Sequence, residues 1–322
     1  MRLGYSLGSL LSINEVLECA LILSKNKPDT VWIPETWGME NFAMQSAVSQ
    51  RVDSKIGSSI INTYSRSPAL ISMGAVTIDT LSKGRLILGL GTSSPSMVED
   101  FHGYEFTKPV ARMREYVEII RLLTAGKKID YTGKFFNLKG FSLLIKPIRD
   151  KIPIYLAAVN QKMVELTWEI GDGVIFYLRP INELKKTISE MTAKRKIDVS
   201  CQIITAISED GEKALIRAKE TIAFYVAVGK VYREFLAKNG FAAETENIYD
   251  EFKRSGLGSV AQCVPDSMVN KLAICGTPEE CKHKLAKFTD AGVSLPIIQF
   301  NPVGDTLDSF KLLTSTFSEW CN

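Results

Sequence analysis

Residues 55–92 read KIGSSIINTYSRSPALISMGAVTIDTLSKGRLILGLGT, and the fold can be worked out from this stretch. Two short apolar runs, 55–61 and 85–90, have the length and composition of buried strands. Between them, Ser67 stands at a helix N-cap position and Pro68 at the first helical position. The stretch therefore predicts a strand–helix–strand unit, in which a crossover helix makes the two strands parallel.

The same alternation continues along the chain. Each strand-like run is followed by helical periodicity, and the first helix shows the capping-box spacing of Ser12 and Glu15. Eight such units are typical of a closed (β/α)8 barrel in the α/β class, and a doubly wound open sheet is the competing fold. The other six predicted strands cover residues 2–7, 30–35, 154–158, 173–177, 199–207 and 295–300.

The domain organisation follows from length and punctuation. Barrels often reach this size as one unit, and we find no linker rich in Pro, Gly or Ser, so residues 1–322 are expected to form one barrel domain. Two insertions are predicted. One is a hairpin over 131–147 that turns at Gly133 and Lys134, and the other is a helical segment over about 210–275.

Composition narrows the function classes. Hydrophobic residues make up 45% and charged residues 23%, as in soluble globular proteins. The net charge of +3 comes without a basic stripe, so we expect no nucleic-acid partner. The six cysteines are scattered and only two histidines are present, which argues against zinc. No run approaches the roughly 20 apolar residues of a membrane span and no signal peptide is recognisable, so we expect a cytoplasmic location and no membrane partner.

In a (β/α)8 barrel the residues after the strands share one rim, where active sites lie. This rim is polar but mostly uncharged. It offers no close carboxylate pair for glycoside hydrolysis and no serine–histidine arrangement, because the only histidines are His102 and His283. A neutral, hydroxyl-lined mouth suits a large planar cofactor that performs the chemistry itself. The first six strand ends are residues 6–8, 35–37, 59–63, 91–94, 157–160 and 177–179.

Several stretches resemble a known family. They are VWIPETWG at 31–38, the block from Asn62 to Gly103, residues 114–141, and IPIYLAA at 152–158. Together they resemble the luciferase-like monooxygenase superfamily, and within it the branch that uses the deazaflavin coenzyme F420 and includes the 5,10-methylenetetrahydromethanopterin reductases. The resemblance implies a (β/α)8 barrel, in agreement with the strand and helix pattern.

The resemblance also implies a coenzyme site at the strand ends. Ser59 and Ile60 match a bulge behind the deazaflavin ring that often contains a cis peptide bond, although an ordinary trans strand end is the alternative. Glu35 matches a carboxylate, usually Asp, that contacts the coenzyme head, and it is the one catalytic candidate. Its longer side chain could instead pair with a basic residue. The remaining positions that match ring, tail or phosphate contacts are Asn62, Thr92, Ser93, Val159 and Asn160.

On the substrate side the resemblance implies Ser6, Thr36, Trp37 and Phe224. Alcohol-oxidising relatives carry His where this chain has Thr36, and threonine cannot move a proton near neutral pH. Ser6 replaces a glutamate of the methylene reductases. Trp37 can form a wall of the substrate site, while core packing is the alternative for it and for Phe224. His102 is expected either near the mouth or on a surface loop.

Three hypotheses follow. The first is an F420-dependent oxidoreductase that transfers a hydride between the deazaflavin and a C=N or C=C bond, as in the methylene reductases. The second uses FMN and oxygen as a monooxygenase, with Arg66 and Arg179 as candidates to bind the FMN phosphate. The third is a non-catalytic flavin-binding relative. The resemblance implies a homodimer or a higher homo-oligomer that acts on a small molecule.

Overall fold

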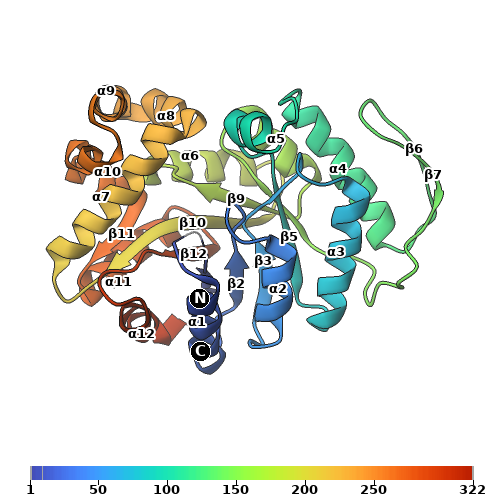
Figure 1. The fold of residues 1–322 in the computed structure, drawn as a ribbon, viewed down its shortest axis with the longest axis horizontal. Coiled ribbons are helices and arrows are strands. Elements are labelled where there is room, and N and C mark those ends of the chain that lie inside the picture. Colours follow the sequence, from blue (N-terminus) through green and yellow to red (C-terminus); the bar gives the residue numbers. More distant parts are fainter. Residues whose placement is uncertain (1, 9, 321–322) are drawn as a thin grey trace.

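A closed barrel of parallel strands forms the centre of the computed structural model, which describes residues 2–8 and 10–320 (Figure 1). The barrel closes because β10 pairs with both β9 and β12, and β12 pairs with β1. The predicted (β/α)8 barrel is confirmed, and the open sheet is wrong. The eight barrel strands are β1 Gly4–Ser6, β2 Thr30–Ile33, β3 Lys55–Ser58, β5 Leu86–Gly91, β8 Ile154–Ala157, β9 Gly173–Tyr177, β10 Asp198–Ile207 and β12 Leu295–Phe300.

Large side chains fill the interior of the barrel. Trp32, Tyr155 and Ile297 belong to one buried cluster inside it, whereas the opposite faces of the strands pack against the helices. Trp32 fits because residue 57 is glycine: a Cβ atom on Gly57 would lie 2.2 Å from the indole ring. Strands buried on both faces explain why the apolar runs in the sequence are nearly continuous.

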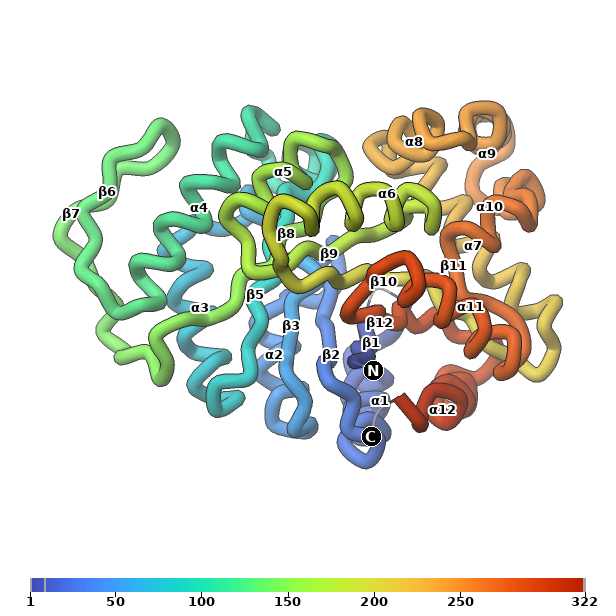
Figure 2. Tube along the Cα trace, turned by 180° about the vertical axis from the view of Figure 1, so that it is seen from behind, coloured from blue at the N-terminus to red at the C-terminus, as the bar shows by residue number. Residues whose placement is uncertain are grey.

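Helices surround the barrel (Figures 1 and 2). The first begins with the predicted capping box, in which the Glu15 N–H donates to Ser12 Oγ and the Ser12 N–H donates to the Glu15 carboxylate. The third begins at Pro68 after the Ser67 cap, as predicted. The outer helices are α1 Ile13–Asn26, α2 Asn41–Ser49, α3 Pro68–Leu81, α4 Pro109–Thr124, α5 Gln161–Ile170, α6 Ile181–Thr192, α7 Gly211–Val228, α11 Pro278–Asp290 and α12 Thr306–Thr316.

An antiparallel hairpin, β6 Ile129–Thr132 and β7 Asn137–Phe141, extends from the barrel beside α3 and α4 (Figure 2). The Gly133 N–H donates to the Phe136 carbonyl at 2.9 Å across the turn. The buried Glu115 carboxylate on α4 accepts three further backbone N–H groups of this turn. The hairpin begins at Ile129, two residues before the predicted start, and its second strand ends at Phe141, before the predicted end at 147.

The chain between β10 and α11 is mostly helical, and it lies at the far end of the molecule from the hairpin (Figure 1). It also contains a strand that the sequence prediction missed: β11, Ala273–Gly276, pairs in parallel with the end of β10. Four residues that follow a helix without a loop carry no strand signal of their own. The helical elements here are α8 Lys230–Leu236, a π-helical turn Ala237–Phe241, α9 Ala242–Ser255, a 3-10 helix Leu257–Cys263 and α10 Asp266–Leu272.

Among the described residues, no helix combines the length and the apolar character that crossing a membrane requires.

Candidate active site at the mouth of the barrel

Buried polar side chains gather where the barrel strands end. In the paired strands Ser6 lies beside Gln299, and Tyr177 lies beside Gln202. Several of their polar atoms have no hydrogen-bond partner within the described chain, namely Ser59 Oγ, Asn62 Nδ2, Tyr177 OH, Gln202 Oε1 and Gln299 Oε1. Buried polar atoms without partners are rare in folded proteins. Five of them at one end of a barrel indicate a place where a ligand completes the hydrogen bonding.

The bulge predicted at the end of the third barrel strand is present. The peptide bond between Ser59 and Ile60 is cis. After it, the two-residue strand β4, Ile61–Asn62, pairs with the end of β5. A Cβ atom on Gly91 would lie only 2.5 Å from Ile60 Cδ1 and 3.4 Å from Ala157 Cβ. The absence of a side chain at Gly91 therefore leaves the space into which Ile60 packs at the mouth.

Glu35 is held in an ion pair with Arg66. Two guanidinium nitrogens donate to its two carboxylate oxygens at 2.6 and 2.7 Å, and only 11% of the glutamate side chain is exposed. The backbone N–H groups of Asn41 and Asn62 also donate to it, at 3.2 and 3.3 Å. Of the two possibilities for Glu35, pairing with a basic residue is the one observed. A carboxylate with these four bonds connects β2, α2 and β4.

The charge of Arg66 is stabilised at this position. Burial by itself lowers its pKa, but hydrogen bonds and charges from Glu35 and Glu40 outweigh that effect and raise the pKa. Arg179, the other candidate for an FMN phosphate, is 3% exposed and pairs with Glu183 at 3.2 Å. Burial lowers the pKa of Arg179 to about 10, against the opposing charge of Glu183. Both arginines are therefore already paired within the chain.

The other predicted coenzyme positions lie in two loops at the mouth. Thr92 follows β5 and is half-buried, and Ser93 is exposed in a left-handed backbone conformation with φ +58°. Val159 accepts a hydrogen bond from Arg179 through its carbonyl, at 2.6 Å. Asn160 is the exposed N-cap residue of α5, with an extended backbone and a side chain that does not cap the helix.

A cavity of about 560 Å³ opens beside these strand ends. Three of the four predicted substrate residues line it: Thr36 and Trp37 after β2, and Phe224 on α7. The rings of Trp37 and Phe224 lie 6.3 Å apart. The fourth, Ser6, is buried beside Gln299, which lines the cavity. The structure thus brings the predicted substrate residues to one place.

Two other predictions concern metal sites and His102. The described residues include no group of three or more His, Cys, Asp or Glu side chains that could hold a metal ion. His102 is half-buried at the end of a π-helical turn, Met97–Phe101, and its ring contacts Phe101 at 4.9 Å. It is not one of the residues that line the mouth cavity.

Comparisons with known proteins agree with this geometry. The family model described as luciferase-like monooxygenase matches residues 1–295. The chain belongs to this family. The 5,10-methylenetetrahydromethanopterin reductase of Archaeoglobus fulgidus is 31% identical to the luciferase-like chain over 88% of this chain and 89% of its own length. A putative coenzyme F420-dependent oxidoreductase of Mycobacterium tuberculosis is 30% identical over 84% of this chain and 86% of its own length.

Solved structures show the same fold. The coenzyme F420-dependent tetrahydromethanopterin reductase from Methanopyrus kandleri superposes on this luciferase-like chain with a TM-score of 0.87. The match covers 98% of this chain and 97% of the other at 20% sequence identity. At that identity the likeness supports the barrel architecture alone.

Sequence reasoning did not single out two glutamines of the luciferase-like mouth. Gln299 lines the cavity, and Gln202 is the strand partner of Tyr177 at the end of β9. The ring of Tyr225, which also lines the cavity, lies 5.0 Å from that of Tyr177 and 5.8 Å from that of Tyr232. Burial raises the pKa of all three tyrosines, so their hydroxyls stay protonated near neutral pH. The only available signal for the glutamines was their alternation with apolar residues in two strands.

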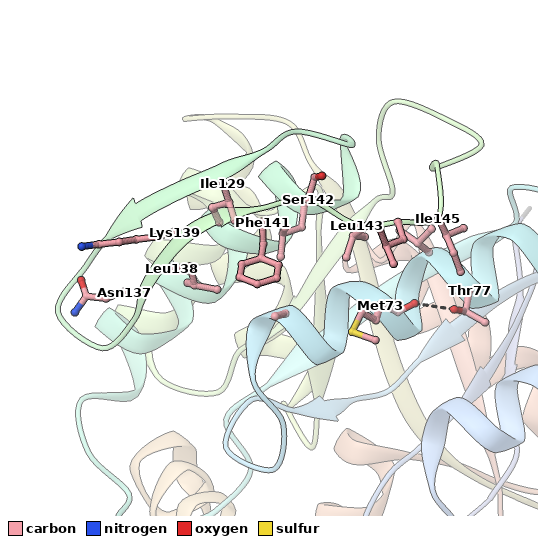
Figure 3. Close-up of a pocket in the computed structure, with 14 residues that line it drawn as sticks. Met73, Thr77, Ile129, Asn137, Leu138, Lys139, Phe141, Ser142, Leu143 and Ile145 are labelled. Atoms are coloured by element: carbon pink, nitrogen blue, oxygen red, sulfur yellow. Dashed lines mark hydrogen bonds between the residues drawn. The ribbon is translucent and has the colours of Figure 1, made fainter.

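A second cavity, of about 660 Å³, lies between α3 and the hairpin of the luciferase-like chain (Figure 3). Its lining is mainly apolar, with Met73 on the helix and Phe141 and Leu144 on the hairpin side. Phe141 is 76% exposed and Leu144 fully exposed. None of the predicted site residues lines this cavity, so it is a surface groove separate from the mouth.

Proposed function

We propose that this luciferase-like chain is a coenzyme F420-dependent oxidoreductase that acts on the C=N bond of a one-carbon pterin, as 5,10-methylenetetrahydromethanopterin reductases do. The observation that carries the proposal is the cluster of unpartnered polar atoms at the barrel mouth, next to a cavity walled by Trp37 and Phe224. The names of two relatives at 30 and 31% identity point to the same coenzyme or reaction.

The residues around the bulge fit a deazaflavin ring. The pyrimidine edge of such a ring carries carbonyl acceptors, and Asn62 Nδ2 and Ser59 Oγ are buried groups that can donate to them. Gly91 leaves the space that Ile60 occupies beside Ala157, so the Ile60 side chain would form the surface behind the ring. Thr92 and Ser93 would contact the coenzyme tail. Val159 and Asn160 precede α5, and a helix N-terminus favours a phosphate.

The bound coenzyme supplies or accepts the hydride, and the protein supplies orientation. In our proposal Ile60 fixes the position of the deazaflavin ring, while Trp37 and Phe224 hold the substrate ring by aromatic contact. Hydride addition to a cationic C=N carbon needs no proton. The titratable side chains that line the mouth cavity fit this chemistry, because Arg217 pairs with Glu220 at 2.8 Å and burial raises the pKa of Tyr225.

The FMN alternative receives less support from the geometry. Arg66 is paired with Glu35 and Glu40, and Arg179 with Glu183, so the charge of each arginine is already partly neutralised before an FMN phosphate could bind. A monooxygenase of this family is expected to place a histidine in the cavity lining. His102 is not among the residues that line the cavity.

We also propose that the protein is a homodimer and that the exposed face of α3 forms the contact. Leu70 and Met73 are 50% and 55% exposed on this helix. The one charged residue in α3, Asp79, is buried and pairs with Arg149 at 2.6 Å. A solvent-facing helix surface without charge marks an interaction site. A second copy is the occupant we favour, because a two-fold interface pairs a patch with itself and charge-free centres are typical of homodimers.

The test is a fluorescence titration of apoprotein with F420 and with FMN. We expect tight F420 binding and weak FMN binding, followed by anaerobic reduction of methylenetetrahydromethanopterin by reduced F420. Tight FMN binding with weak F420 binding would overturn the coenzyme assignment. Tight F420 binding without turnover would leave a non-catalytic binding protein and overturn the substrate assignment.

A substitution sharpens the titration. Asn62→Asp removes the unpartnered Nδ2 donor but keeps the oxygen that accepts the Tyr64 N–H at 2.9 Å. We expect F420 to bind at least about tenfold more weakly, the effect of one lost hydrogen bond of about 1.4 kcal/mol. Asn270→Asp, on the exposed surface of α10, is the matched control and should bind F420 as the wild type does.

A further inference from the structure

One residue at the mouth combines burial, position and an unused hydrogen-bonding atom. Gln299, on β12, is 7% exposed and lines the 560 Å³ cavity. Its Oε1 atom has no hydrogen-bond partner in the part of the chain that the structure describes. Neighbouring β10 contributes a second such atom, Oε1 of Gln202, which is 8% exposed. Two buried amide oxygens without donors therefore lie on adjacent strands: Gln299 lines the cavity, and Gln202 is the strand partner of Ile297, two residues before Gln299.

One polar neighbour shares the cavity with Gln299. Tyr225 lines the same cavity, and burial raises the pKa of its hydroxyl, which therefore stays protonated near neutral pH. Gln299 Oε1 nevertheless accepts no hydrogen bond from any described group. On the adjacent strand, the buried Ser6 is the register partner of Gln299.

We infer that Gln299 is the specificity-determining residue of the mouth cavity, and that its amide oxygen accepts a hydrogen bond from an N–H group on the ring of the substrate. The inference rests on the proposed function and names the feature of the pterin substrate that the site recognises, an N–H group on its ring.

The chemistry of the site explains the selectivity. A buried oxygen that has lost water and gained no donor is unfavourable, and a ligand N–H removes that penalty on binding. A simple ketone has no hydrogen to donate and leaves the amide oxygens unpaired. The aromatic walls, Trp37 and Phe224, contact any flat ring, so they add affinity without telling one ring from another.

The experiment measures binding of pterin, the bare bicyclic ring, to the F420-loaded enzyme by calorimetry. Gln299→Leu removes the acceptor at similar volume, and we expect pterin to bind at least tenfold more weakly while F420 affinity changes less than twofold. Gln299→Glu keeps an acceptor oxygen and should restore most of the pterin affinity. Gln50→Leu, on the exposed end of α2, is the matched control. With methylenetetrahydromethanopterin as substrate, KM should rise more than kcat falls in Gln299→Leu.

The outcomes separate the two claims. Wild-type affinity for pterin in Gln299→Leu overturns the inference and leaves the proposed function intact. Equal loss of pterin and F420 binding in that variant, or failure of Gln299→Glu to restore binding, shows a structural role and also overturns it. A wild-type enzyme that binds F420 but not pterin overturns the inference alone. A wild-type enzyme that binds neither overturns both.

Discussion

Replacing Glu35 by glutamine should destabilise the fold far more than the same change at a surface ion pair. Glu35 receives two bonds from Arg66 at 2.6 and 2.7 Å, and the two side chains are only 11% and 12% exposed. Removing one partner of a buried pair typically costs about 3–5 kcal/mol, because the other charge is left without compensation. Arg66 also contacts Glu40, which is 50% exposed and would still compensate part of the arginine's charge in the variant. We therefore expect Glu35→Gln to lower the free energy of unfolding by about 2–3 kcal/mol, at or below the lower end of the range for a buried pair.

The chain offers a matched control. Arg114 and Glu169 form an ion pair with the same two-bond geometry, at 2.7 and 2.6 Å, but their side chains are 40% and 58% exposed. Water and salt screen such a pair, so Glu169→Gln should leave the unfolding midpoint nearly unchanged. The two variants differ in burial and not in bond geometry.

The assay is equilibrium unfolding in urea followed by far-ultraviolet circular dichroism, at low and at high salt. High salt should weaken the surface pair further and change the effect of Glu35→Gln little, because a buried pair is poorly screened. Equal destabilisation by Glu35→Gln and Glu169→Gln would refute the reasoning. So would a Glu35→Gln effect that disappears at high salt.

Three further predictions follow from other contacts. Gly91→Ala places a Cβ atom 2.5 Å from Ile60, so Ile60 must rotate and F420 should bind more weakly; Gly211→Ala, at the start of α7 and with its nearest Cβ contact at 3.4 Å, should bind F420 normally in the same titration. Leu70→Lys, at a 50% exposed position on α3, should turn dimers into monomers by light scattering, whereas Leu21→Lys, at a 45% exposed position on α1, should not. Burial alone would raise the pKa of Asp198, but hydrogen bonds from Ser294, Tyr155 and Arg2 outweigh that effect and hold the pKa below 3.8. The ionised Asp198 therefore stabilises the fold above pH 3.8, and this stabilisation is lost as the pH falls through the folded-state pKa. Asp198→Asn should therefore be less stable than wild type at pH 7 and lose less stability on acidification, and parallel acid-unfolding curves would contradict this.

Much of the fold could be predicted from the sequence because the barrel repeats one local unit. The stretch 55–92 contains two apolar strands and a helix with a Ser67 cap and Pro68 start, and each signal acts over a few residues. The missed strand, β11, has no such signal. It contains four residues and pairs with the end of the longer strand β10.

The site was less predictable because its contacts join distant residues. Glu35 and Arg66 are 31 positions apart, and no local pattern selects that pairing over a coenzyme contact. Gln299 meets Ser6 only when the last strand closes the barrel against the first. Trp37, Thr36 and Phe224 were found through resemblance to a family, and the structure brings them together around one cavity.

The distribution of charge in the barrel explains why hydrogen bonds, and not ion pairs, are expected to select the substrate. At the start of the strands, Asp198 binds Arg2, and Asp29 binds both Arg2 and Lys55. Near the mouth, Glu35 and Arg179 are likewise paired within the chain. The buried mouth atoms without partners belong to amides and hydroxyls. A site built mainly from neutral groups favours a ligand by matching donors to acceptors. Of the titratable groups that line the cavity, Glu220 is paired with Arg217, and burial raises the pKa of Tyr225, so neither is poised to move a proton near neutral pH. Hydride transfer to a carbon that is already cationic is the redox step that such a site can support with orientation alone.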